Sequence, residues 1–183
     1  MGTMMHARLA ETMNFVEEKR RELLKSFDGV PGEKLCLRAN PGGWSVAEIL
    51  DHLRMVESGV ARMITKRTTK AREQGLGEET STSSVMASFD SHAAKLDAGL
   101  IQAPETVRPR ADVDISEALE GLESSREALR AAVVSASGLS LGEIKHTHGI
   151  LGELDLYQWL IFVGHHEVRH RKQIERTLQS LPQ

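Results

Sequence analysis

Apolar residues recur at three- and four-residue intervals through most of the chain, which is the pattern of amphipathic α-helices. The pattern predicts four long helices and a weaker fifth one, over residues 6–27, 45–72, 85–101, 116–136 and 155–178. No stretch alternates apolar and polar residues for long enough to predict a strand. We therefore expect an all-α fold: an antiparallel four-helix bundle with an additional helix or long loop between its second and third main helices.

Two of the predicted helices have well-defined starts. Ser45 is followed three residues later by Glu48, and Asp155 by Gln158, and both pairs fit a capping box. Glycine and proline in residues 28–43 predict a connection, in which Cys36 is expected to pack inward as an inert thiol. Residues 139–154 are interpreted as a loop, and residues 75–112 contain no motif that indicates their role.

The length of the chain and its net charge limit the classes of protein to which it can belong. A chain of 183 residues is expected to form a single domain over 1–183, with a sizeable core. The net charge of −3 argues against a general binder of nucleic acid or anionic membranes. No apolar run could span a bilayer and no secretory segment is present, so a cytoplasmic protein is expected. With one cysteine, a metal site would have to use His, Asp or Glu.

The last predicted helix carries two histidines, His166 and His170, on its apolar face. Their four-residue spacing places both side chains on the same side of a helix. Burial of bare imidazoles is unfavourable unless they gain partners, and a divalent metal would serve both. The alternatives are that the two rings are exposed or bonded to nearby carboxylates.

A third histidine, His52, lies on the apolar stripe of the predicted helix over 45–72, beside Ile49, Leu53 and Val56. Facing stripes in a bundle could bring three imidazoles around one point. Three protein ligands leave a coordination position for water or substrate, as in catalytic metal sites. The spacing is specific for His166 and His170 and only suggestive for His52.

The same residues carry a family resemblance that extends over essentially the whole chain. The matching stretches are Trp44–Leu53, His148–Leu154 and His166–Ile174, together with Trp159 and Phe162. They resemble the DinB/YfiT-like superfamily of metalloenzymes, which are four-helix bundles. The resemblance implies that His52, His166 and His170 bind a divalent metal, zinc or nickel. It also implies a homodimer and, in characterised branches, transfer or isomerisation that uses a low-molecular-weight thiol.

A competing motif is His166-Glu167-Val168-Arg169-His170, which matches the His-Glu-x-x-His pattern of zinc peptidases with Glu167 as general base. The extended pattern requires a histidine at position 176, where this chain has Arg176. No strand is predicted upstream to hold a peptide. A peptidase is therefore disfavoured, and we interpret Glu167 as a supporting or surface residue.

Further candidates flank the histidines. His148 is a candidate for substrate contact, although a role in the turn explains it equally simply. Arg169, with Arg171 and Lys172, forms a basic edge that could bind the carboxylates of a thiol cofactor, unless it is a solvated face. The remaining polar positions considered are expected to lie on the surface: His6, Glu18, Arg20, Arg21 and His92.

These observations favour a metal-dependent transferase that adds a low-molecular-weight thiol to a small electrophile. The ion would lower the pKa of a bound thiol or water. The alternatives are a metal-dependent hydrolase and a non-catalytic, metal-stabilised dimer or stress-response protein. The expected partners are a small-molecule substrate and a second copy of the chain, with no nucleic acid and no membrane.

Overall fold

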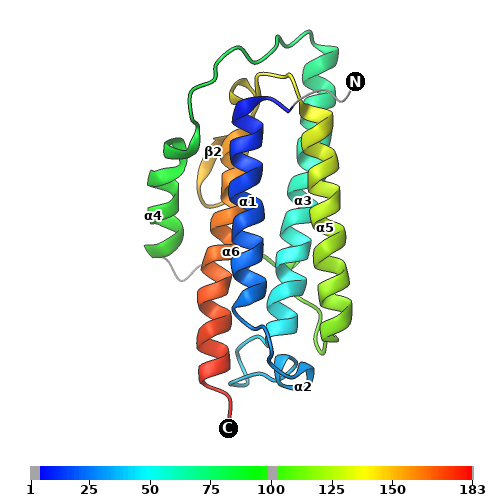
Figure 1. Ribbon diagram of the computed structural model, residues 1–183, viewed down its shortest axis with the longest axis vertical. Coiled ribbons are helices and arrows are strands. Elements are labelled where there is room, and N and C mark those ends of the chain that lie inside the picture. Colours follow the sequence, from blue (N-terminus) through cyan, green and yellow to red (C-terminus); the bar gives the residue numbers. More distant parts are fainter. Residues whose placement is uncertain (1–4, 99–102, 183) are drawn as a thin grey trace.

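Four long helices, packed side by side, form the body of the protein (Figure 1). The computed structural model describes residues 5–98 and 103–182. The helices are α1 (Ala7–Lys25), α3 (Val46–Glu73), α5 (Ile115–Ala136) and α6 (Leu156–Gln179). In Figure 1, α1 and α6 run downward, whereas α3 and α5 run upward. The predicted all-α four-helix bundle is confirmed.

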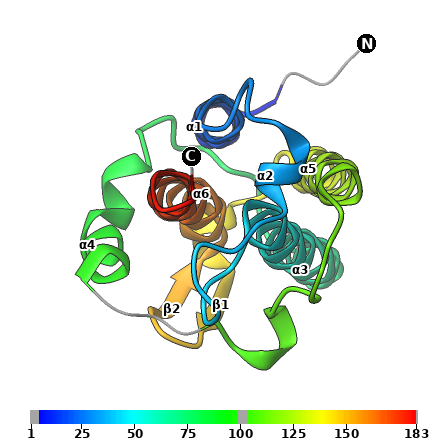
Figure 2. The same cartoon turned by 90° about the horizontal axis from the view of Figure 1, so that it is seen from below.

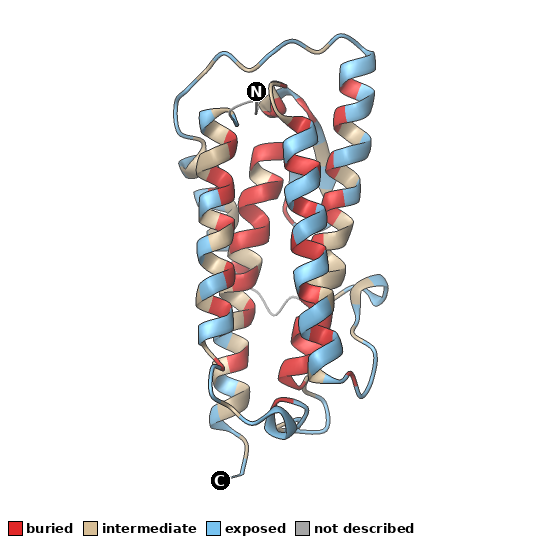
Figure 3. Ribbon diagram, turned by 45° about the vertical axis from the view of Figure 1, so that its right-hand side comes forward, coloured by how far each residue is buried: buried red, intermediate tan, exposed pale blue. Residues whose placement is uncertain are grey.

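The buried faces of the four helices turn toward one another (Figure 3). Seen along the bundle, α1 lies beside α6 and α3 beside α5, with α4 outside α6 (Figure 2). Gly164 of α6 permits a close approach of α1, because a Cβ atom there would lie 2.4 Å from the ring of Phe15. The apolar core divides into two clusters, one around Val16 and Val60 and the other around Leu23 and Leu50.

The capping boxes predicted from the sequence start α3 and α6. The Ser45 hydroxyl accepts a hydrogen bond from the Glu48 amide at 3.2 Å, and the Glu48 carboxylate accepts from the Ser45 amide at 2.8 Å. Asp155 and Gln158 make the equivalent pair of bonds at 2.9 and 3.0 Å. Local sequence therefore determines where the two helices that carry the histidines begin.

The segment expected to be a plain loop, residues 139–154, contains a hairpin. Strands β1 (Lys145–His148) and β2 (Gly152–Asp155) pair antiparallel, with His148 opposite Gly152, and a short 3₁₀ turn spans Leu141–Glu143. The prediction of no strands is wrong here because each strand has only four residues, too few to show an alternating pattern. The hairpin lies beside α6, on the side away from α1 (Figure 2).

The described parts of residues 75–112 lie between the top of α3 and the bottom of α5 (Figure 1). The predicted helix over 85–101 is a 3₁₀ turn (Met86–Phe89) followed by α4 (Asp90–Ala98), and its last residues lie outside the described ranges. A second 3₁₀ turn spans Glu105–Val107. Phe89 and Leu96 are buried, so this crossover adds a layer over α6.

The connection over residues 28–43 contains a one-turn helix, α2 (Gly32–Leu35). Leu35 packs into the core cluster around Leu23 and Leu50, whereas Cys36 is exposed. The expectation that Cys36 packs inward is therefore wrong. Among the described residues, no helix is both long and apolar enough to cross a membrane.

Candidate metal centre

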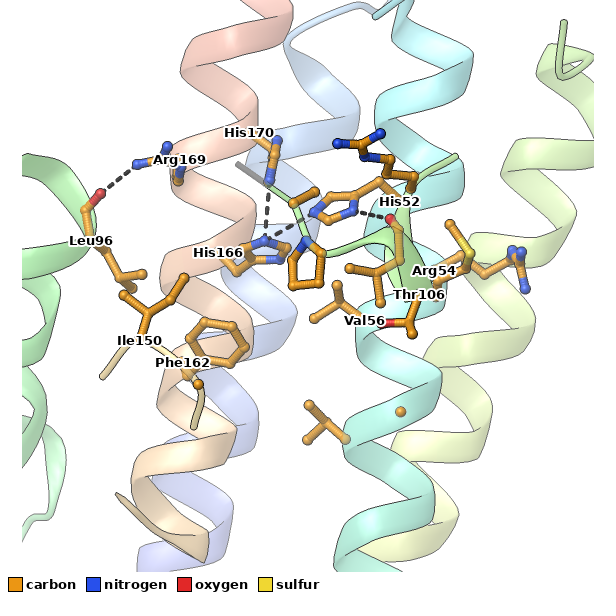
Figure 4. A pocket seen from close by; sticks show the side chains of 18 of the residues that line it. His52, Arg54, Val56, Leu96, Thr106, Ile150, Phe162, His166, Arg169 and His170 are labelled. Atoms are coloured by element: carbon orange, nitrogen blue, oxygen red, sulfur yellow. Dashed lines mark hydrogen bonds between the residues drawn. The ribbon is translucent and has the colours of Figure 1, made fainter. Parts of the chain in front are cut away.

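His52 of α3 and His166 and His170 of α6 come together in the structure (Figure 4). The Nε2 atom of His166 lies 3.3 Å from that of His52 and 3.1 Å from that of His170. One ring nitrogen from each residue falls within 4.8 Å of the others. The four-residue spacing on α6 and the stripe position on α3 thus produce the cluster expected from the sequence.

The outer nitrogens of two rings are held by acceptors. Nδ1 of His52 lies 2.6 Å from the carbonyl oxygen of Val107, and Nδ1 of His170 lies 2.8 Å from the side-chain oxygen of Gln173. Since oxygen of this kind only accepts, each Nδ1 carries the proton in the neutral ring. The Nε2 atoms of His52 and His170 therefore present lone pairs to the centre of the cluster.

Hydrogen bonds alone do not satisfy this arrangement. A neutral His166 has one N–H, which can reach only one of its two close Nε2 neighbours, so at least one contact sets lone pair against lone pair. A cation between the rings removes that conflict. Two nitrogens bound tetrahedrally to zinc at about 2.0–2.1 Å lie about 3.3 Å apart, close to the two Nε2 separations measured from His166. The residues present fit a divalent metal.

The surroundings keep the three imidazoles neutral. Burial, followed by the neighbouring His170 and His52, lowers the pKa of His166 well below its usual range. Burial and the proximity of His52 lower the pKa of His170 to about 3. Burial also lowers the pKa of His52, against the opposing effect of its bond to Val107. Neutral imidazole is the form that binds metals, so the cluster is ready to act as a ligand set at neutral pH.

The cluster opens into a large cavity of about 1770 Å³ between α3, α6, the β-hairpin and residues 103–108. Part of its wall is apolar and aromatic, formed by Val56, Val60, Met63, Ile150, Trp159 and Phe162. Six Arg and Lys residues also line it: Arg54, Arg62, Arg108, Arg169, Lys172 and Arg176. No Asp or Glu belongs to the described lining.

His148, the candidate for substrate contact, lies in the cavity wall at the end of β1. Its Nδ1 accepts hydrogen bonds from the amides of Ile150 and Leu151 at 3.1 and 3.2 Å, so it also shapes the turn. The ring centre of His148 is 4.7 Å from that of Phe162 and 5.1 Å from that of Trp159. Burial and then nearby His92 lower the pKa of His148, which favours the neutral ring.

The predicted basic edge is divided between two faces of α6. Arg169 and Lys172 line the cavity, and Arg169 donates to the backbone oxygen of Leu96 (Figure 4). Arg171 does not belong to the described cavity lining, and its guanidinium lies 4.0 Å from the carboxylate of Glu22 and 3.8 Å from that of Glu175. Arg176 also lines the cavity. In the sequence it was considered only as the residue that replaces the histidine of the extended peptidase pattern.

Glu167 faces a different part of the molecule from the two histidines beside it. Its carboxylate accepts hydrogen bonds from Arg20 and Arg126, both at 2.8 Å. Those guanidinium groups also bind Glu57, at 2.9 Å from Arg20 and 2.7 Å from Arg126. We call these four residues, one from each long helix, the charged layer.

The charged layer separates the two apolar clusters of the core. All four members are at most 4% exposed. The expectation that Arg20 lies on the surface is therefore wrong, and so is the surface alternative for Glu167. The sequence did contain a signal: each residue falls on its helix's apolar stripe, as Arg126 does between Leu122 and Leu129. With its carboxylate held by two arginines, Glu167 has no hydrogen bond to the histidine cluster among the described residues.

Comparison with known proteins agrees with this architecture. An uncharacterised protein of Bacillus subtilis (strain 168), YuaE, is 26% identical over 170 residues, which cover 92% of this chain and 98% of YuaE. The crystal structure of TT2238, a four-helix bundle protein, is similar with a TM-score of 0.57 and 18% identity, over 92% of this chain and 98% of the other. The family model of the DinB superfamily matches residues 16–174. The chain therefore belongs to the DinB superfamily.

Proposed function

We propose that the protein is a divalent-metal-dependent transferase that joins a low-molecular-weight thiol to a small electrophile. The observation that carries the proposal is the convergence of three neutral imidazoles at the wall of a large cavity. Zinc or nickel suits such nitrogen ligands. A divalent ion held there would lower the pKa of a thiol placed beside it and so supply a nucleophile at neutral pH.

The chain's own residues would hold and orient this centre. His52, His166 and His170 supply the ligand nitrogens, while Val107 and Gln173 fix the rotation and tautomer of two rings through their Nδ1 atoms. Such outer partners influence metal affinity strongly, because they orient the ligands and raise their basicity. Three protein ligands leave room for a substrate atom on the cavity side.

His148 is proposed to donate a hydrogen bond to substrate. Since its Nδ1 accepts two backbone amide bonds, the neutral ring carries its proton on Nε2. Ring contacts with Trp159 and Phe162 hold the imidazole in the cavity wall. A fixed N–H donor of this kind would stabilise negative charge that develops on the electrophile as the thiol attacks.

Two alternatives use the same residues differently. A metal-dependent hydrolase would employ water in place of the thiol, and a non-catalytic, metal-stabilised dimer would employ no substrate at all. The open cavity beside the histidines favours a small-molecule enzyme over the dimer. A peptidase receives less support, because the carboxylate of Glu167 is bound by Arg20 and Arg126.

The direct test begins with metal-loaded protein, a panel of low-molecular-weight thiols and a chlorinated aromatic electrophile. We expect a rate above background that depends on which thiol is supplied and is lost in His166→Ala. His92→Ala is the control, because His92 does not belong to the described cavity lining. If only esters or amides react, the hydrolase alternative replaces the transferase.

Metal binding itself is tested separately. An ion that binds only the folded state should raise the melting temperature with increasing concentration, and chelation should lower it, by mass action. An unchanged melting temperature during a titration that loads the site would contradict coupling between metal binding and folding. Measuring molecular mass with and without the ion tests the proposed homodimer.

A further inference from the structure

Asp51 immediately precedes His52 on α3, and both residues are at most 3% exposed. The carboxylate of Asp51 accepts hydrogen bonds on two sides. Oδ1 accepts from Nε of Arg54 at 2.9 Å, and Oδ2 accepts from the backbone amide of Arg110 at 3.2 Å. Burial of a carboxylate is costly unless it has such partners. Asp51 therefore ties α3 to the segment that leads into α5.

The side chain of Arg54 is held against α5 by a close approach of the two helices. A Cβ atom at Gly121 would lie 2.4 Å from Cδ of Arg54, so a glycine there leaves room for the arginine. Nε and Nη2 of Arg54 lie 2.9 and 2.8 Å from the same oxygen of Asp51. Arg54 thus occupies Oδ1 and leaves Oδ2 for the amide of Arg110.

A short and stiff stretch of backbone connects Arg110 to the metal centre. The carbonyl oxygen of Val107, three residues earlier, lies 2.6 Å from Nδ1 of His52. Between them, the ring of Pro109 fixes its own φ and restricts Arg108 to extended backbone. Arg108 has that conformation, with φ −69° and ψ 135°. A stretch with so little freedom transmits the position of the Arg110 amide to the Val107 carbonyl.

We infer that Asp51 is a positioning residue for the metal centre: by holding the amide of Arg110, it places the carbonyl of Val107 that orients the ring of His52. Two consecutive residues of α3 thus hold the segment 107–110 at both of its ends. Asp51 acts through Val107, because it does not belong to the described cavity lining. The inference rests on the proposed metal binding, but the orientation of His52 can be measured without an ion.

A simpler effect of the Asp51 charge must be separated from this one. A negative charge beside His52 would attract a cation whether or not the Arg110 amide is held. Asp51→Asn removes the charge but keeps an oxygen that can accept from the amide, whereas Asp51→Ala removes both. The side chains of Arg54 and Arg110 are 31% and 56% exposed, so neither substitution leaves a buried, unpaired cation. We expect both variants to fold, which circular dichroism checks.

The first measurement uses metal-free protein at neutral pH. Long-range proton–nitrogen NMR correlation reports which nitrogen of the His52 ring carries the proton. The unsubstituted protein and Asp51→Asn should hold it on Nδ1, whereas Asp51→Ala should move a measurable fraction to Nε2. Pro109→Gly loosens the same stretch without removing a buried charge and should move the proton in the same direction. The inference therefore remains testable if the alanine variant does not fold.

Glu117→Gln is the matched control. Glu117 pairs with the side chain of Arg110 at 2.7 Å and makes no bond to its amide, so this substitution should leave the His52 proton on Nδ1. A proton that stays on Nδ1 in Asp51→Ala and in Pro109→Gly would overturn the inference.

The second measurement is calorimetry with zinc. Asp51→Ala and Pro109→Gly should weaken binding by about tenfold, the lower end of the effect of partners that orient a ligand. Asp51→Asn should recover most of the affinity lost in Asp51→Ala. Equal losses in the asparagine and alanine variants would assign the effect to charge and overturn the inference. If no protein binds zinc but the His52 proton still moves, the positioning role stands and the proposed metal centre fails.

Discussion

His166 and Glu167 are neighbours in the sequence, but they belong to two polar sites of opposite kind. His166 joins a cluster of neutral nitrogens whose lone pairs meet at the cavity wall. Glu167 joins the charged layer, in which two arginines and two glutamates neutralise one another inside the bundle. A rotation of about 100° per residue around the helix axis separates the two environments.

The difference shows how a buried polar site reveals its role. In the charged layer the opposite charges are equal in number and each guanidinium reaches both carboxylates, which ties four helices together, although Oε2 of Glu167 accepts no hydrogen bond among the described residues. In the histidine cluster the partners are incomplete, because at least one close nitrogen pair lacks a proton between its members. The charge-balanced network is suited to structure, and the cluster of opposed lone pairs is suited to a cation.

The largest expected effect comes from breaking the charged layer. Arg126→Met should lower the free energy of unfolding by about 3–5 kcal/mol, because it leaves Glu57 and Glu167 buried with too little positive charge. Urea unfolding followed by circular dichroism measures the loss. Arg130→Met is the matched control: that side chain is 45% exposed and pairs with Glu17 and Glu123, so about 1 kcal/mol or less should be lost. Similar losses of unfolding free energy in both variants would show that the charged layer does not stabilise the bundle.

Removing a histidine should affect the metal most directly. His52→Ala, His166→Ala and His170→Ala should each lower the affinity for zinc by more than about 100-fold, which exceeds the usual effect of losing an outer partner of a ligand. Elemental analysis of protein purified without a histidine tag, together with calorimetry, measures the change. His92→Ala should retain the metal, and equal metal content in all four variants would disprove the assigned ligand set.

Changing a residue that only orients a ligand should have a smaller effect. Gln173→Leu removes the oxygen that accepts from Nδ1 of His170, and metal affinity should fall by about 10–100-fold while the fold is retained. Calorimetry with zinc measures the affinity. Gln173→Glu restores an acceptor at the same place and should recover much of the binding. Failure of Gln173→Leu to weaken zinc binding would show that the bond does not orient His170.

The smallest predicted effect is the dependence of stability on pH in metal-free protein. The unfolded chain protonates His170 near its ordinary pKa of 6.5, whereas the folded protein does so only at about 3. The unfolded state therefore binds more protons between these values, and acidification through this range destabilises the fold. His170 alone should contribute about 1.4 kcal/mol per pH unit.

Denaturant unfolding of chelator-treated protein at pH 6 and pH 5 measures this slope. His170→Leu should show a shallower dependence than the unsubstituted protein, since it lacks the titrating ring. A slope that is the same in both proteins would show that His170 does not remain neutral in the folded state.

Local sequence alone determined the helices and much of the candidate metal centre. The caps at Ser45 and Asp155 depend on side chains three residues away, and helical geometry sets the common face of His166 and His170. His52 could be placed on an apolar stripe by the same argument. That His52 lies next to His166 and His170 could only be expected from the sequence, because His166 is 114 residues further along the chain.

Tertiary structure decided what surrounds those residues. The partners of Glu167 come from other helices, with Arg20 147 residues away, so nothing in its own helix distinguishes an internal ion pair from surface charge. The β-hairpin is too short to have a periodic signature, and its second strand packs against α6. The cavity joins α3, α6, the hairpin and residues 103–108, so it exists only once they are assembled. Periodicity records which side of a helix is buried, but only packing determines what that side meets.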